Sequence, residues 1–296
     1  MQSNQKTKVI LSAILLTVFF IISMKTMAST FDVTVTGKGK PIIFIHGYAS
    51  EKSVWNETVD FLKSDYQCHI IQIAGFAGKD PVNKDNFLSA VKDDIAEYIK
   101  SNNLEPAILI GHSMGGFLSL WLASEYPELV SKVVSVDGVP YLSAIVNPAA
   151  TPETQKEYAK KLFNYDNDFA ERENGMTDEQ LMQIFSTMTI HEEKTPVLFE
   201  WTKKSDARTL NQTMFEMMTT DLRENAKNIE APVLVFGAWI AYKNYGATKE
   251  STYKLYEAQF QNVKDHKIML TNKGKHFIMW DDFEWYSSAI KKFLQK

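Results

Sequence analysis

Short apolar runs alternate with stretches of helical period along most of the chain after residue 30. The apolar runs lie at 31–36, 42–45, 68–73, 107–110, 133–136, 233–236 and 267–270. Several of them, such as IIFI, AILI and VLVF, are continuously apolar, which is typical of central strands covered on both faces. Strand-type runs separated by helical segments predict βα units and a mostly parallel sheet. The Gly-Lys-Gly turn at 37–39 predicts that the first two strands pair antiparallel.

The helical segments can be recognised by their period. Apolar residues recur every four positions through 87–99, giving one apolar face. The same spacing follows residue 113 and stops at Pro127, which ends that helix. Asp281, followed three residues later by Glu284, resembles the capped start of a final helix.

Residues 138–230 interrupt this alternation. The segment contains no convincing strand and is rich in Met, Phe, Tyr, Glu and Lys at helical spacing. It is far longer than an ordinary connection between a strand and a helix. We interpret 138–230 as a helical cap inserted into an α/β core domain made of 29–137 and 231–296.

The first residues have the pattern of a secretory signal peptide. Residues 1–8 carry two lysines and no acidic residue, 9–24 are almost entirely apolar, and a small residue, Ala28, precedes the expected cut. The apolar stretch is short for a membrane span of roughly 20 residues. Residues 1–28 are therefore predicted to be a signal peptide. An uncleaved N-terminal anchor is the alternative, and this segment is the only membrane contact that we expect.

Cleavage and export make a first testable prediction. The mature chain should begin near Ser29 and be found outside the cytoplasm, in the periplasm or secreted, because the cleavage pattern ends at Ala28. N-terminal sequencing of protein purified from the native host measures this directly. An intact Met1 on soluble cytoplasmic protein would contradict it.

Charge and cysteine content narrow the classes of function. The formal net charge is -4 and no long basic run is present, which argues against a nucleic-acid partner. The single cysteine, Cys68, cannot form an internal disulfide and lies in an apolar run, so we interpret it as a buried packing residue. The sequence has no HExxH, no CxxC and no phosphate-binding loop, and no metal or other cofactor is expected.

The strongest chemical signal is the sequence GHSMG at 111–115. It follows a predicted buried strand and opens a predicted helix, the context of a nucleophile elbow. Ser113 is therefore the predicted nucleophile. In such an elbow the oxyanion is held by two backbone N–H groups, which here would belong to Tyr48 and Met114. His46 is interpreted as a structural histidine that holds its loop.

His276 is the predicted general base. It lies after the last predicted strand and before the last helix, on the sheet edge where the nucleophile is expected. His191 falls in the cap and His266 precedes the strand, so neither fits this position.

These motifs, in this order, resemble the α/β-hydrolase superfamily in its capped, esterase-like branch. PIIFIHGYAS, ILIGHSMGGFLSLWLA, VVSVDGVP, PVLVFGAW and KHFIMWDD carry the resemblance, which covers nearly all of 31–296. It implies an α/β-hydrolase fold with a mostly parallel, eight-stranded sheet flanked by helices, and no metal or organic cofactor.

The sequence departs from many relatives at the triad acid. The segment after the penultimate strand, GAWIAY, has no carboxylate before Glu250. Some relatives take the acid from the end of the strand that follows the nucleophile helix, and Asp137 matches that position. Glu250, and an enzyme without a triad acid, remain alternatives. Asp281 and Asp282 follow His276 too closely to orient it and are interpreted as helix caps.

The expected function is hydrolysis of a small-molecule carboxylic ester or related acyl compound by Ser113, His276 and Asp137. Hydrolysis of a C–C bond or a lactone by the same residues is one rival, and a binding protein that lost catalysis is another. Trp239, Phe277 and Trp280 fall at the catalytic edge, where they either line an apolar pocket or seal the sheet. The substrate and the oligomeric state are not encoded in these patterns.

Overall fold

The computed structural model describes residues 29–170 and 175–295. The predicted signal peptide, 1–28, lies outside these described residues. Within them, no helix combines the length and the apolar character that crossing a membrane would require.

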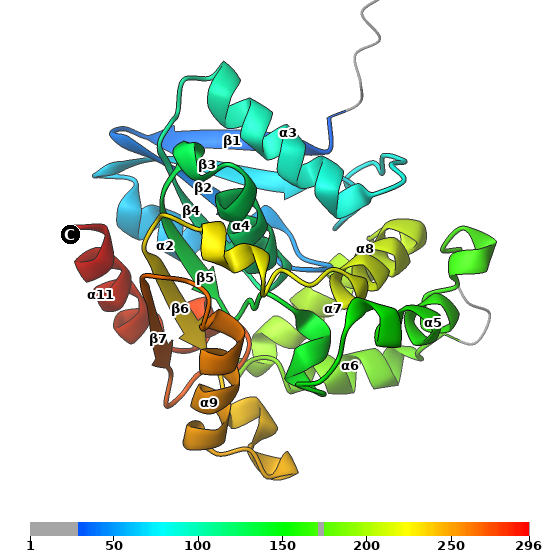
Figure 1. Ribbon diagram of the computed structural model, residues 1–296. Helices are drawn as coiled ribbons and strands as arrows, with labels where there is room; N and C mark the ends of the chain where they lie inside the picture. The colour runs from blue at the N-terminus through cyan, green and yellow to red at the C-terminus, as the bar shows by residue number, and fades with distance from the viewer. Residues whose placement is uncertain (1–28, 171–174, 296) are drawn as a thin grey trace, which may run out of the picture.

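A single sheet forms the centre of the molecule (Figure 1). Its strand order is β1-β3-β2-β4-β5-β6-β7, and all neighbours are parallel except β1 and β3. The strands are β1 (Phe31–Gly37), β2 (Lys40–Ile45), β3 (Tyr66–Ile73), β4 (Ala107–His112), β5 (Val130–Val136), β6 (Val233–Gly237) and β7 (His266–Leu270).

Two sequence-based expectations about the sheet are wrong. The described residues form seven strands rather than eight, all of them among the apolar runs recognised in the sequence. β1 pairs antiparallel with β3, not with β2. The turn at 37–39 carries the chain across the end of β3, which lies between β1 and β2 and pairs with both. A local turn pattern cannot reveal a third strand that enters from later in the chain.

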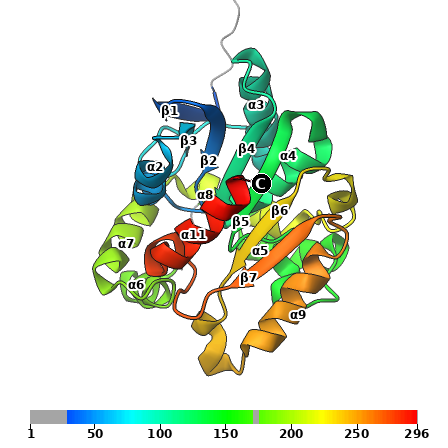
Figure 2. The ribbon, with the colours of Figure 1, turned by 90° about the vertical axis from the view of Figure 1, so that its left-hand side faces the viewer.

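Each face of the sheet is covered by helices, because the central strands are apolar on both sides. In β2, for example, Ile43 and Ile42 point into different hydrophobic clusters. One cluster is covered by α3 (Phe87–Ser101), α4 (Met114–Glu125) and α9 (Lys249–Phe260). The other is covered by α2 (Asn56–Leu62) and α11 (Phe283–Leu294), as Figures 1 and 2 show from two sides.

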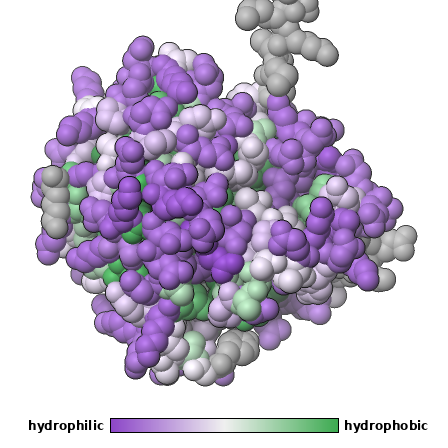
Figure 3. All heavy atoms as spheres, viewed as in Figure 1, coloured by the Kyte–Doolittle hydropathy of each residue, from purple (hydrophilic) through white to green (hydrophobic). Residues whose placement is uncertain are grey.

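The segment between β5 and β6 forms helices in its described part and contains no strand there. Figure 1 shows its four α-helices grouped together at one end of the sheet. They are α5 (Pro152–Leu162), α6 (Asp178–Ser186), α7 (Thr195–Lys203) and α8 (Ala207–Thr219), preceded by the short helix η3 (Leu142–Ile145). The face seen in Figure 3 is mostly hydrophilic with small hydrophobic patches. In these four helices the buried apolar side chains include Phe185, Leu198 and Phe215, whereas Tyr158, Ile184 and Val197 are exposed.

Helix α8 is fixed to the core by a partly buried carboxylate. Both oxygens of Glu216 accept hydrogen bonds from the backbone N–H groups of Phe87 and Leu88, at 2.8 and 2.7 Å, at the start of α3. These donors belong to the unpaired N–H groups at a helix N-terminus, where a negative charge is favourable. These two hydrogen bonds hold α8 against the start of α3.

Candidate active site

Ser113 stands on a sharp turn between β4 and α4. Its backbone has φ 53° and ψ -115°, a strained conformation for a residue with a side chain. The turn is tight because α4 approaches β2 closely: a Cβ added to Gly115 would lie 2.1 Å from the Ile45 carbonyl oxygen. Strand, turn and helix therefore have the geometry expected of a nucleophile elbow and place Ser113 at the carboxyl edge of the sheet.

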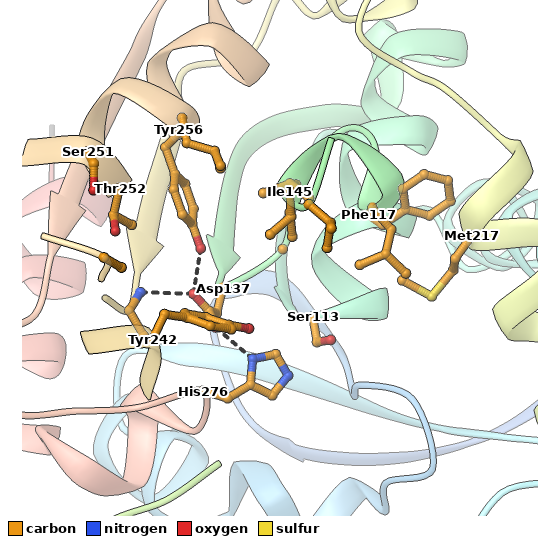
Figure 4. A pocket seen from close by; sticks show the side chains of 17 residues that line it. Ser113, Phe117, Asp137, Ile145, Met217, Tyr242, Ser251, Thr252, Tyr256 and His276 are labelled. Atoms are coloured by element: carbon orange, nitrogen blue, oxygen red, sulfur yellow. Dashed lines mark hydrogen bonds and ion pairs between the residues drawn. The ribbon is translucent and has the colours of Figure 1, made fainter. Parts of the chain in front are cut away.

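His276 lies on the loop after β7, next to this turn. Its Nδ1 is 2.6 Å from Oδ2 of Asp137, and its side chain is 25% exposed. The backbone carbonyl of His276 accepts a hydrogen bond from Nε2 of His112 at 3.1 Å, and the two imidazole rings are 4.5 Å apart. Figure 4 shows the ring nitrogen remote from Asp137 turned toward the Ser113 hydroxyl.

Asp137 follows the last residue of β5 in a left-handed conformation, with φ 51°. Its backbone N–H donates to the carbonyl of Phe236 at 2.7 Å, which ties the turn to β6. Oδ1 accepts from the Ala238 N–H at 2.9 Å and from the Tyr256 hydroxyl at 2.5 Å. The carboxylate is thus aimed at His276 from the position that the sequence predicted.

Glu250, the alternative acid, lies elsewhere. Its side chain is 77% exposed on α9 and forms an ion pair with Lys254 at 2.7 Å. It is outside the set of residues that surround Ser113 and His276.

The interpretation of Asp281 and Asp282 as helix caps is wrong. The final helix α11 begins at Phe283, and Asp282, at its N-cap position, makes no side-chain capping bond but accepts from the Thr271 hydroxyl at 2.7 Å. Asp281 is buried, and its Oδ2 accepts from the Lys275 N–H at 2.8 Å. The Thr189 hydroxyl donates to its Oδ1 at 2.6 Å.

Asp281 therefore links two segments: the loop that contains His276, and the segment between α6 and α7. The three-residue spacing of Asp281 and Glu284 is the same whether Asp281 caps its own helix or binds a distant loop. The capping pattern consequently could not distinguish the two roles.

The loop after β2 lies beside Ser113. A Cβ placed on Gly47 would be 3.3 Å from the Ser113 Cβ, so the next residue, Tyr48, begins a short distance from Ser113. Met114 is the first residue of α4, where backbone N–H groups have no helical partner. Within the described part of the chain, neither the Tyr48 nor the Met114 backbone N–H makes a hydrogen bond.

His46 is a buried structural histidine, as its place in the sequence indicated. Its Nδ1 donates to the Gly47 carbonyl at 2.8 Å and its Nε2 accepts from the Ile73 N–H at 3.0 Å. Burial lowers the pKa of His46 to about 4, so the ring is neutral and holds the loop in place. Cys68 is also buried, and burial raises the pKa of its thiol to about 11.

An apolar pocket of about 360 Å³ opens at Ser113, Asp137 and His276 (Figure 4). Its apolar side chains come from elements far apart in the sequence: Phe117, Leu142, Ile145, Val146, Met217 and Leu255. Hydroxyl groups of Ser251 and Thr252 complete one side. Its volume falls in the usual range for a small-molecule site.

Of the two roles left open for Trp239, Phe277 and Trp280, packing at the end of the sheet is the one that the structure supports, since none of them lines the pocket. Phe277 and Trp280 are buried and stack on each other with ring centroids 4.6 Å apart, so they seal the sheet. Trp239 packs against the core cluster. The aromatic side chains that do line the pocket include Tyr242 and Tyr256, which sequence reasoning missed. Thr252 and Tyr256 are four residues apart, about one turn of α9. This spacing is the sequence signal that both side chains lie on one face of the helix.

Metal chemistry has no candidate centre in the described ranges. No group of three or more His, Cys, Asp or Glu side chains is arranged there to hold an ion. The ionisable and nucleophilic groups that meet at the elbow side of the pocket are the Ser113 hydroxyl, the His276 imidazole and the Asp137 carboxylate.

Comparison with known proteins agrees with this fold. A family model described as "alpha/beta hydrolase fold" matches residues 40–282. The chain is 27% identical over 217 residues to the pimeloyl-[acyl-carrier protein] methyl ester esterase of Shewanella woodyi, covering 70% of this chain and 78% of that protein. Identity to the protein of the same name from Vibrio atlanticus is 27% over 122 residues, 41% of this chain and 45% of the relative. The chain thus spans under half the length of that relative.

Solved structures share the fold. An enol-lactonase from Burkholderia xenovorans aligns with a TM-score of 0.70 at 14% identity, covering 90% of this chain and 96% of the other. An esterase from Exiguobacterium antarcticum aligns with the same score and coverages at 15% identity.

Proposed function

The chain belongs to the α/β-hydrolase family, and on this premise we propose that it is a serine esterase for small carboxylic esters with uncharged, apolar substituents. One observation carries the proposal. The Asp137–His276 pair, joined at 2.6 Å, and the elbow residue Ser113 border one apolar pocket. The similar proteins named above include esterases and a lactonase, which supports hydrolysis as the reaction class.

The proposed reaction uses an acyl-enzyme. Ser113 Oγ attacks the ester carbonyl carbon while Nε2 of His276 accepts the hydroxyl proton, and Asp137 stabilises the imidazolium that forms. Collapse of the tetrahedral intermediate breaks the bond to the alcohol oxygen, which takes the proton from His276. Water then attacks the acyl-enzyme by the same route and releases the acid and free Ser113.

The backbone N–H groups of Tyr48 and Met114 are proposed to bind the oxyanion. Both groups belong to elements that meet at Ser113, and neither is used within the described protein. Preorganised backbone donors need no rearrangement as charge develops, and loss of one such donor typically costs about 10²- to 10³-fold in rate.

The pocket lining favours uncharged substituents. Its side chains are mostly aliphatic or aromatic, and none of the described lining residues is Lys or Arg. A carboxylate bound there would lose its hydration without gaining a partner, which is strongly unfavourable. This feature, rather than the substrate of any relative, defines the proposed substrate class.

The proposed pocket can be tested by narrowing it. Ile145→Trp should lower kcat/KM for hexanoate and octanoate esters by at least about tenfold, because the indole fills space that the acyl chain needs. Acetate esters should change by less than about threefold. Steady-state hydrolysis of a p-nitrophenyl ester series measures both. Ile184→Trp is the control, since Ile184 lies on α6 outside the pocket and is 36% exposed. Equal losses of kcat/KM for acetate and octanoate esters would show that the acyl chain of the substrate binds elsewhere.

Two rival functions predict different results. Labelling with a fluorophosphonate probe separates a working Ser–His pair from a binding protein that has lost catalysis. The binding alternative rested on the missing carboxylate after β6, and the bond from Asp137 to His276 removes that support. Lactone or C–C bond hydrolysis would use the same residues, and substrate panels containing lactones and β-diketones distinguish it from ester hydrolysis.

A further inference from the structure

Asp137 is a buried carboxylate without a cationic partner other than an imidazole. Its side chain is 7% exposed, and within the described ranges its only ion pair is with His276. Two groups other than His276 donate to it, both to Oδ1: the Ala238 N–H at 2.9 Å and the Tyr256 hydroxyl at 2.5 Å. Because a buried charge must be satisfied by hydrogen bonds, these two donors determine how the carboxylate is held.

Tyr256 reaches Asp137 from a distant element. It lies on α9, and its side chain is 5% exposed within the core cluster. The ring lies against the end of β6: a Cβ added to Gly237 would be 2.8 Å from the Tyr256 Cζ. The glycine therefore leaves room for the ring. Figure 4 shows the Tyr256 hydroxyl directed at the Asp137 carboxylate.

The hydroxyl remains a donor at working pH. Burial, together with the charge of Asp137, raises the pKa of Tyr256 well above its ordinary value. Tyr256 consequently stays protonated. Its hydrogen bond and that of Ala238 occupy Oδ1 and leave Oδ2 directed at His276 Nδ1.

We propose that Tyr256 is a positioning residue of the active site. It fixes the carboxylate of Asp137, through α9, in the orientation that holds the Nδ1–H tautomer of His276. The loop after β6, where many relatives carry the acid, has no carboxylate. Here that loop supplies the Ala238 N–H and α9 supplies the Tyr256 hydroxyl, and both donate to Asp137 at the end of β5. The inference rests on the proposed esterase function.

Tyr256→Phe tests it. The variant keeps the ring and the pocket wall but removes one hydrogen bond to a charged group. Turnover of a p-nitrophenyl ester should fall about 10- to 100-fold with KM changed by less than about twofold, because the lost interaction serves the transition state. The downfield proton resonance of His276 Nδ1–H should also shift. Tyr253→Phe, the same change at a 44% exposed residue of α9, should leave both readouts unchanged.

The outcomes separate this inference from the function on which it rests. If the wild-type protein hydrolyses esters and Tyr256→Phe retains its turnover and its His276 resonance, Tyr256 is only a core residue. A fall in thermal stability with unchanged kcat would likewise assign it a purely structural role. If the wild-type protein neither hydrolyses esters nor reacts with a fluorophosphonate, the proposed function itself fails.

Discussion

Replacing Ser113 by alanine should reduce p-nitrophenyl ester hydrolysis by about 10⁶-fold, as found for nucleophiles of other catalytic triads. The side chain that would form the acyl-enzyme is lost, and the Ser251 and Thr252 hydroxyl groups that also line the pocket belong to α9 rather than to the elbow. The fold should be retained. The turn imposes a φ of 53° on serine and alanine alike, and the substitution removes only a hydroxyl group. Steady-state kinetics and thermal unfolding measure the two effects.

A control makes the Ser113 result specific. Ser186 is an exposed serine at the end of α6, and Ser186→Ala should keep activity within about twofold. Fluorophosphonate labelling should disappear in Ser113→Ala and persist in Ser186→Ala. Retention of more than a few per cent of activity by Ser113→Ala would show that another group is the nucleophile.

The sheet domain could be predicted because its signals are local. Apolar runs identified all seven strands, and the four-residue spacing of Val91, Ile95 and Ile99 identified α3. Ser113 and His276 could be proposed from the sequence because Ser113 comes directly after β4 and His276 lies on the loop after β7, and parallel strands bring such positions to one edge. Asp137 followed from the resemblance, since it matches an acid position that some relatives use.

The pocket could not be predicted because it depends on packing between distant elements. Ile145 on η3, Met217 on α8 and Leu255 on α9 meet only when the segment after β5 docks against the sheet. Two other features also depend on partners from distant parts of the chain. They are the pairing of β1 with β3 and the hydrogen bonds of Asp281 to Thr189 and Lys275. Each depends on a partner that the local pattern does not contain.

Replacing Asp137 by asparagine should cost about 10² to 10⁴ in turnover with binding nearly unchanged. The carboxylate accepts the Nδ1–H of His276 at 2.6 Å, and in the proposed mechanism it stabilises the transient imidazolium. An amide keeps the volume but removes the charge, and it can turn an NH₂ group toward the imidazole and favour the wrong tautomer. Since this interaction strengthens only as the imidazolium forms, the loss should be in kcat rather than in KM.

Glu250→Gln is the matched control for the acid. The residue is 77% exposed and bound to Lys254, so its neutralisation should cost less than about threefold. Both variants are measured with one ester substrate and by their rates of phosphonylation. If Glu250→Gln is the impaired variant and Asp137→Asn is not, the acid has been assigned to the wrong residue. If both remain near wild type, Ser113 and His276 work as a dyad, and Asp137, with the donors of Ala238 and Tyr256, only closes the turn between β5 and β6.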